Sequence, residues 1–134
     1  MTTDSLPQFV QHYLTELRQG NRDNAFHSLI EADPAIVPLL IAAFSREVDV
    51  AFRDDLLRVI AEFRLPDTIP FFADRLFDAH WKAALDFFAA QASPQAVAAL
   101  ERARTRQFDS DRETDEFRAW LEEAITQAQE AQRA

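Results

Sequence analysis

The sequence predicts an all-α protein of about eight helices that pack as antiparallel pairs, and three observations lead to this fold class. Apolar residues recur at spacings of three and four through almost the whole chain, and no segment alternates with the period of two that is typical of a strand. Residues that start and stop helices interrupt this pattern at regular intervals. The 134 residues include one glycine, so tight hairpins, which need positive φ angles, are not expected.

The ends of the helices follow from their capping residues. Gly20 is expected to end the first helix, because glycine readily adopts the left-handed conformation found after a helix. Asp33 and Ser93 each precede a proline at the first helical position, and Asp49 and Asp78 are expected to cap two further helices. The connections are short, which favours antiparallel neighbours. The expected helices are 5–19, 22–31, 34–46, 50–64, 66–77, 79–91, 94–106 and 111–130.

An internal repeat joins these helices into pairs. The segment 34–40 begins with proline and has a second proline four residues later, and 66–72 repeats this arrangement. The segment 94–100 repeats the first proline and the apolar pattern, with alanine in place of the second proline. A two-helix repeat of about 30 residues is typical of an α-solenoid, in which each repeat packs on its neighbours.

The repeat resembles the short HEAT or HEAT-like repeats. In that family a proline lies early in the first helix, and a Val-Arg pair often opens the second, a place that Phe52-Arg53 takes here. The next unit has His80-Trp81 there and lacks the arginine. The resemblance covers residues 22–106 and implies a short HEAT-like α-solenoid, with a compact helical bundle as the structural alternative.

The domain organisation expected from this pattern is a single domain over 1–134. Residues 1–20 would form an N-terminal capping helix, 22–106 the repeats, and 110–134 an acidic C-terminal capping helix. The N-terminal helix is half polar, as expected of a helix that covers the open end of a stack. The C-terminal helix is rich in glutamate, glutamine and arginine, and its apolar stripe consists of Phe117, Trp120, Leu121 and Ile125.

The charge of the chain indicates which partners to expect. Aspartate and glutamate number 23 against 14 lysines and arginines, which gives a net charge of −9. Such a charge argues against nucleic acid or an anionic membrane as the main partner and favours another protein of basic character. We expect the chain to be a monomer or a weak dimer.

Further features of composition bear on localisation. The chain has no cysteine, which excludes disulfides and thiolate metal sites and suits the cytoplasm. Its start has neither the basic nor the apolar region of a signal peptide. The longest apolar stretch, 36–44, is too short to cross a bilayer and contains Pro38. We therefore expect a cytoplasmic protein.

Catalytic and metal-binding chemistry is not expected. His12 and Glu16, and Asp23 and His27, have the i,i+4 spacing of a two-ligand metal site, but this is also the spacing of ordinary surface pairs on a helix. His80 lies on a third helix, and a zinc site needs three or four convergent ligands. The chain contains neither a glycine-rich phosphate loop nor a nucleophile elbow. We predict no catalytic residues, no cofactor, no metal and no enzymatic activity.

Binding residues are expected on the second helices of the repeats and near the start of the last helix. Successive second helices form the curved face of a solenoid, and the charged positions there include Arg53 and Lys82. The acids of the last helix have an alternative role, because acids in a first turn stabilise the helix dipole. Phe108 is the candidate exposed aromatic, and its alternative role is a staple under the last helix. The predicted partner-binding residues are Asp54, Arg58, Glu62, Asp86, Phe108, Asp111, Asp115 and Glu116.

Together, the HEAT-like fold class, the acidic charge and the lack of catalytic motifs predict a protein-interaction module. The specific hypothesis is a small acidic inhibitor, or immunity protein, that binds and neutralises a basic toxin. An adaptor or assembly subunit is the alternative within the same class. The resemblance also covers HEAT-like enzymes such as bilin lyases and DNA glycosylases, but a DNA-binding member needs a basic concave face, which the net charge of −9 argues against.

Overall fold

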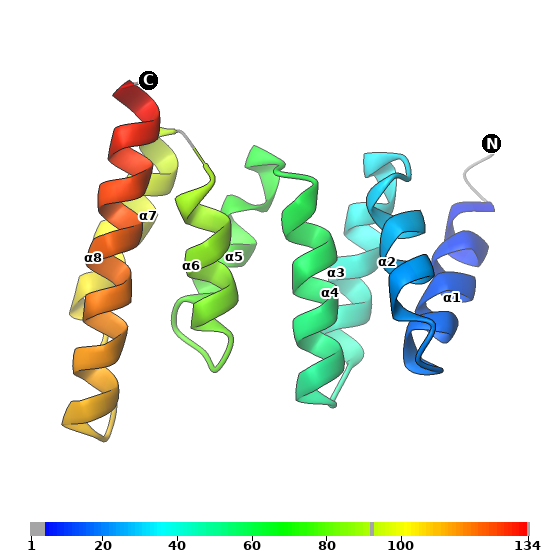
Figure 1. Cartoon of the computed structure of the whole chain (residues 1–134), viewed down its shortest axis with the longest axis horizontal. Coiled ribbons are helices and arrows are strands. Elements are labelled where there is room, and N and C mark those ends of the chain that lie inside the picture. Colours follow the sequence, from blue (N-terminus) through cyan, green and yellow to red (C-terminus); the bar gives the residue numbers. More distant parts are fainter. Residues whose placement is uncertain (1–4, 92, 134) are drawn as a thin grey trace. The chain divides into compact units, whose positions relative to one another are not determined.

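A computed structural model of the chain describes residues 5–91 and 93–133, and these residues are all-α (Figure 1). Within these two ranges there are eight α-helices, three short 3₁₀ helices and no strand, which confirms the predicted fold class. The α-helices are α1 Ser5–Arg18, α2 Arg22–Ile30, α3 Val37–Arg46, α4 Val50–Glu62, α5 Ile69–Arg75, α6 Trp81–Ala89, α7 Pro94–Arg102 and α8 Asp111–Arg133. The 3₁₀ helices are η1 Pro34–Ile36, η2 Pro66–Thr68 and η3 Ala103–Thr105.

Most of the predicted helix caps are present. Asp33 accepts a hydrogen bond from the N–H of the second residue after it at 2.8 Å, and Asp49 does the same at 3.0 Å. The Ser93 hydroxyl accepts from the N–H three residues later at 3.2 Å. Gly20 follows α1 with a φ of +94°, the left-handed conformation that favours glycine. These contacts satisfy N–H groups that have no partner inside the helix.

Asp78 has a different role from the predicted one. Its side chain accepts a hydrogen bond from the N–H of His80 at 2.8 Å, and His80 itself occupies the N-cap position of α6. The Asp78 carboxylate therefore closes the turn before α6, and the helix begins at Trp81, two residues later than expected. The prediction that Asp78 is the N-cap of this helix was wrong, because His80 takes that position.

The second proline of the repeat determines how its first helix begins. Pro38 has no N–H to donate to the carbonyl of Pro34, so this carbonyl accepts from Val37 instead and closes a 3₁₀ turn. The carbonyl of Pro66 accepts from the residue before Pro70 in the same way. In the third copy of the repeat this position is Ala98, and α7 starts directly as an α-helix.

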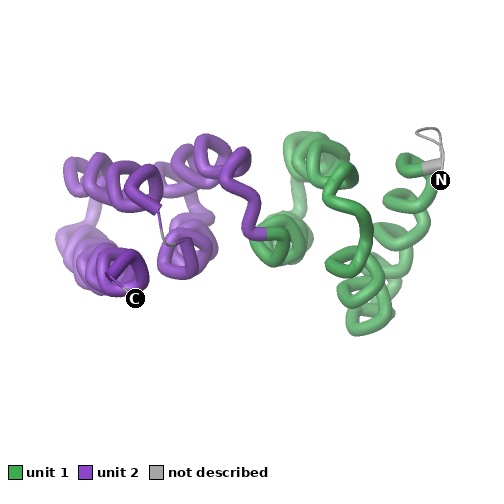
Figure 2. The backbone as a smooth tube through the Cα atoms, turned by 90° about the horizontal axis from the view of Figure 1, so that it is seen from above, with its two compact units in different colours: residues 1–63 green, residues 64–134 purple. Residues whose placement is uncertain are grey.

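The chain divides into two compact units, Met1–Phe63 and Arg64–Ala134, which Figure 2 colours separately. In the first unit α1 pairs with α2, and α3 pairs with α4. The two pairs pack with α1 against α3 and α2 against α4. Side chains from all four helices fill the core, including Leu17, Leu29, Leu40, Phe44, Leu56 and Ile60.

The second unit repeats this arrangement. Helix α5 pairs with α6, α7 pairs with α8, and the pairs pack with α5 against α7 and α6 against α8. Phe72 and Phe87 stack at its centre with ring centroids 3.9 Å apart and planes inclined by 15°. Both side chains are buried in the core of the second unit. First helices therefore pack on first helices, and second helices on second helices, within each unit.

None of the helices in the described ranges is by itself both long and apolar enough to cross a membrane. By length and composition alone, one pair passes that test together: Arg22–Ile30 with Pro34–Arg46, bent by 111°. The side chains at the centre of this pair, Leu29 and Leu40, are fully buried in the core of the first unit.

Candidate functional site

The binding residues predicted on α4 differ in how far they reach solvent. Arg58 and Glu62 are exposed, as expected, whereas Asp54 is half-buried. Arg53, which the sequence places on the same face, is also half-buried, and its guanidinium lies 4.1 Å from the centroid of the Phe44 ring. Arg53 therefore packs on the core of its unit and is not part of an open binding face.

The remaining predicted residues lie in the second unit. Asp86 is exposed on α6, and Asp111, Asp115 and Glu116 are exposed in the first part of α8. Glu116 is the one of these acids for which an ion pair is found, with Lys82 on α6 at 3.2 Å. The structure thus divides the predicted set, with three residues in the first unit and five in the second.

Phe108 has the alternative role given above and is not an exposed anchor. It is half-buried and contacts the Phe117 ring at 5.5 Å and the Trp81 ring at 6.2 Å. The Arg106 guanidinium covers its other side, 3.9 Å from the ring centroid. Phe108 therefore packs under the start of α8 as a staple, because the connection before α8 folds back onto α6.

Trp120 is an exposed aromatic residue that the sequence did not single out as a binding residue. Its position among the apolar residues of α8 indicated burial, yet 44% of its surface is exposed. Residues 117, 121, 124, 125 and 128 form the buried stripe of α8, and Trp120 lies at the edge of this stripe. The Trp81 ring contacts it edge-on at 5.9 Å, and the ammonium of Lys82 lies 5.1 Å from its centroid.

An open groove of about 220 Å³ runs between α6 and α8 beside Trp120. Buried or half-buried Leu85, Ala89 and Ala124 contribute its apolar lining. Exposed Asp86 and Glu123 carry its charges, and its lining includes neither lysine nor arginine. The full set of lining residues is Leu85, Asp86, Ala89, Trp120, Glu123, Ala124 and Gln127.

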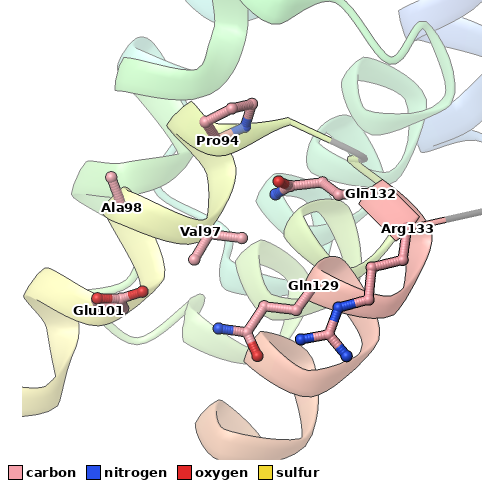
Figure 3. Close-up of a pocket in the computed structure, with 7 residues that line it drawn as sticks. All are labelled: Pro94, Val97, Ala98, Glu101, Gln129, Gln132 and Arg133. Carbon is pink, nitrogen blue, oxygen red and sulfur yellow. The ribbon is translucent and has the colours of Figure 1, made fainter.

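A larger open groove, of about 490 Å³, lies between α7 and α8, and Figure 3 shows its lining. One acid, Glu101, and one base, Arg133, line it together with Gln129 and Gln132, so it carries no net charge. The Gln132 amide donates to the carbonyl of Ser93 at 2.9 Å and holds the end of α8 to the start of α7. This groove lacks both an exposed aromatic and a charge preference.

The histidines considered as metal ligands lie in different settings. His12 is exposed and lies 3.7 Å from Glu16. Asp23 and His27 line an open groove of about 240 Å³ in the first unit, which also contains Arg22 and Arg58. Asp55, the other acid of this groove, is paired with Arg22 at 2.5 Å. Across residues 5–91 and 93–133, no group of three or more histidine, aspartate and glutamate side chains could hold one.

The arginines near the end of α7 make structural contacts. Arg104 donates two hydrogen bonds to Glu122 on α8, at 2.7 and 2.8 Å, and these bonds lower the pKa of the Glu122 carboxyl. Arg106 donates to the carbonyls of Leu76 and Asp78 at 2.6 and 3.0 Å, and its partial burial lowers the pKa of its guanidinium. Both arginines are therefore engaged within the second unit and do not form an anion-binding patch.

Comparison of the chain with protein-family models, with curated proteins and with solved structures found no match. The α6–α8 surface combines an exposed indole, an apolar groove and two carboxylates, Asp86 and Glu123, for which residues 5–91 and 93–133 supply no ion-pair partner. Such a surface can hold a cationic and partly apolar segment of another protein.

Proposed function

We propose that this chain is a short HEAT-like protein-interaction module that binds a basic partner protein in the cytoplasm. The observation that carries this proposal is the composition of the α6–α8 surface, where exposed Trp120 lies beside Asp86 and Glu123. Tryptophan is among the residues that contribute most to binding at protein interfaces, and opposite charges steer the partner to the surface. The net charge of −9 supports a basic partner over an acidic one.

The specific form of the proposal is a small inhibitor, or immunity protein, that neutralises a basic toxin. Carboxylates on an inhibitor can occupy the cationic site that a toxin uses for a nucleic acid or another anionic substrate. An adaptor that holds a basic subunit would use the same surface. The two roles are therefore distinguished by whether the partner is toxic when it is free.

The test is affinity capture from the protein's own cells at low and then moderate salt, with the bound proteins identified by mass spectrometry. We expect one basic protein at equimolar amount that moderate salt releases, because screening weakens contacts between exposed charges. A variant with Asp86→Lys and Asp115→Lys should lose this protein. The matched control with Glu31→Lys and Asp67→Lys changes two exposed acids elsewhere and should retain it.

The captured protein is then expressed without this chain in a growth assay. Growth arrest that co-expression of the chain relieves supports the inhibitor, and normal growth supports the adaptor. Capture of no basic protein, or equal loss in both double variants, would contradict binding through the acidic surface.

A further inference from the structure

The α6–α8 surface contains one cation position that the chain fills itself. The Lys82 ammonium lies 3.2 Å from the Glu116 carboxylate, 5.1 Å from the centroid of Trp120 and 5.3 Å from that of Trp81. An ammonium in this position is stabilised both by the carboxylate and by the negative faces of the indole rings. This internal contact shows which ligand chemistry the surface favours.

One helical turn further along α6 and α8, a carboxylate and an indole again lie together, but no lysine or arginine accompanies them. Helices α6 and α8 run parallel here, because Lys82 pairs with Glu116 while Asp86 and Trp120 line the next stretch of the same interface. Asp86 lies four residues after Lys82, and Glu123 three residues after Trp120, so each helix contributes one exposed acid to the groove. No lysine or arginine lines this groove.

The two acids of the groove have no ion-pair partner among residues 5–91 and 93–133. Glu123 accepts a hydrogen bond from the Gln127 amide at 3.4 Å, which leaves its charge uncompensated. Glu122, the adjacent residue on α8, is instead paired with Arg104. Of these two adjacent acids on α8, the one that lines the groove is therefore the one without an ion pair.

The apolar part of the groove adds a second requirement for the ligand. Leu85 and Ala124 are only 2% and 5% exposed and form a floor, and the indole of Trp120 contributes further apolar surface beside it. A side chain with an aliphatic stem and a cationic head covers both regions, because the stem lies on apolar surface while the head stays near the carboxylates. Lysine and arginine have this form.

We propose that the groove between α6 and α8 is the docking point for a lysine or arginine side chain of the basic partner protein. Its aliphatic stem packs on Leu85 and against the ring of Trp120, and its charged head lies between Asp86 and Glu123. This inference rests on the proposed function and makes it more specific, since it assigns the chemistry of one contact within the interface.

The test is an NMR titration of the full chain with a soluble peptide of alternating lysine and leucine. The indole N–H of Trp120, assigned with Trp120→Phe, should shift, whereas that of Trp81 should shift much less. Asp86→Asn with Glu123→Gln should weaken peptide binding roughly tenfold, the size expected for two solvent-exposed charge contacts. Trp120→Ala should weaken it by a similar or larger factor.

The matched control is Asp109→Asn with Glu130→Gln, which removes the same two kinds of charge outside the groove. This control should bind the peptide within roughly twofold of the unchanged chain, because neither residue lines the groove and exposed charges that make no direct contact contribute little. A peptide of alternating glutamate and leucine should not shift the Trp120 indole. Circular dichroism of each variant verifies that the helices are retained.

Three outcomes would overturn the inference. The control could weaken binding as much as the groove variant, which would mean that the peptide responds to net charge alone. The lysine peptide could leave the Trp120 indole unshifted. The chain could dimerise in a way that Trp120→Ala abolishes, which would mean that a second copy covers the groove. All three outcomes concern the groove alone and leave the result of the capture experiment unchanged. Failure of this inference can therefore be distinguished from failure of the proposed function.

Discussion

The guanidinium of Arg106 offers a direct test of how the second unit is held together. It donates to the carbonyls of Leu76 and Asp78, just beyond the end of α5, at 2.6 and 3.0 Å. Both carbonyls lie in the turn between α5 and α6, so Arg106 fixes this turn. Hydrogen bonds from a charged donor contribute roughly 1.5–3 kcal/mol each, and partial burial of the charge offsets part of that sum.

We therefore expect Arg106→Met, which retains the length and removes the donors, to lower the free energy of unfolding by about 2–4 kcal/mol. With a urea m-value of about 1.5 kcal/mol/M, a loss of 3 kcal/mol lowers the unfolding midpoint by about 2 M. The assay is urea unfolding followed by circular dichroism. Arg104→Met is the matched control and should cost much less, because the contact of Arg104 with Glu122 is exposed to solvent. A loss for Arg106→Met no larger than that of the control would refute the reasoning.

Three further predictions concern the core, a helix connection and the repeat. Phe87→Ala should cost about 3–5 kcal/mol of stability, because the ring is 3% exposed and stacked, while Phe77→Ala, at a position 51% exposed, should cost at most about 0.5 kcal/mol in the same denaturation assay. Glu47 accepts two backbone hydrogen bonds that lower its pKa below 4.5, so its stabilisation is present above that pH and is lost as pH falls through the folded-state pKa. The stability difference between the unchanged chain and Glu47→Gln should accordingly vanish in acid, as measured by unfolding at a series of pH values. Pro38→Ala restores an N–H to the first turn of the repeat, so NMR chemical shifts of residues 34–36 should become α-helical, and unchanged 3₁₀ shifts would contradict the role given to Pro38.

Local chemistry explains why the helices could be predicted closely. The hydrogen bonds at Asp33, Asp49 and Ser93 join residues two or three apart, so neighbouring sequence is sufficient to predict them. The exception at Asp78 is also local, because an aspartate can close a turn or cap a helix with the same side-chain contact. The 3₁₀ turns η1 and η2 went unpredicted, although the second proline of the repeat marks both of them.

The binding residues were predicted less well, because exposure depends on which helices meet. Arg53 and Phe108 were expected to be available to a partner, and the structure packs the first on Phe44 and the second on Phe117. Trp120 was expected to join an apolar stripe and is substantially exposed. The acids at Asp86 and Glu116 are exposed as predicted, and only the structure distinguishes the paired acid from the unpaired one.

The amino-acid sequence alone was sufficient to predict that the chain is all-α, the order and approximate bounds of its helices, and the sign of its net charge. Periodicity, capping and composition are properties of neighbouring residues or of the chain as a whole, so they can be read without knowing which helices touch. The tertiary structure decided which aromatic rings stay exposed, which carboxylates have a cationic partner, and where a groove lies between helices. These properties depend on residues such as Lys82 and Trp120, which are distant in sequence and meet only when α6 packs against α8.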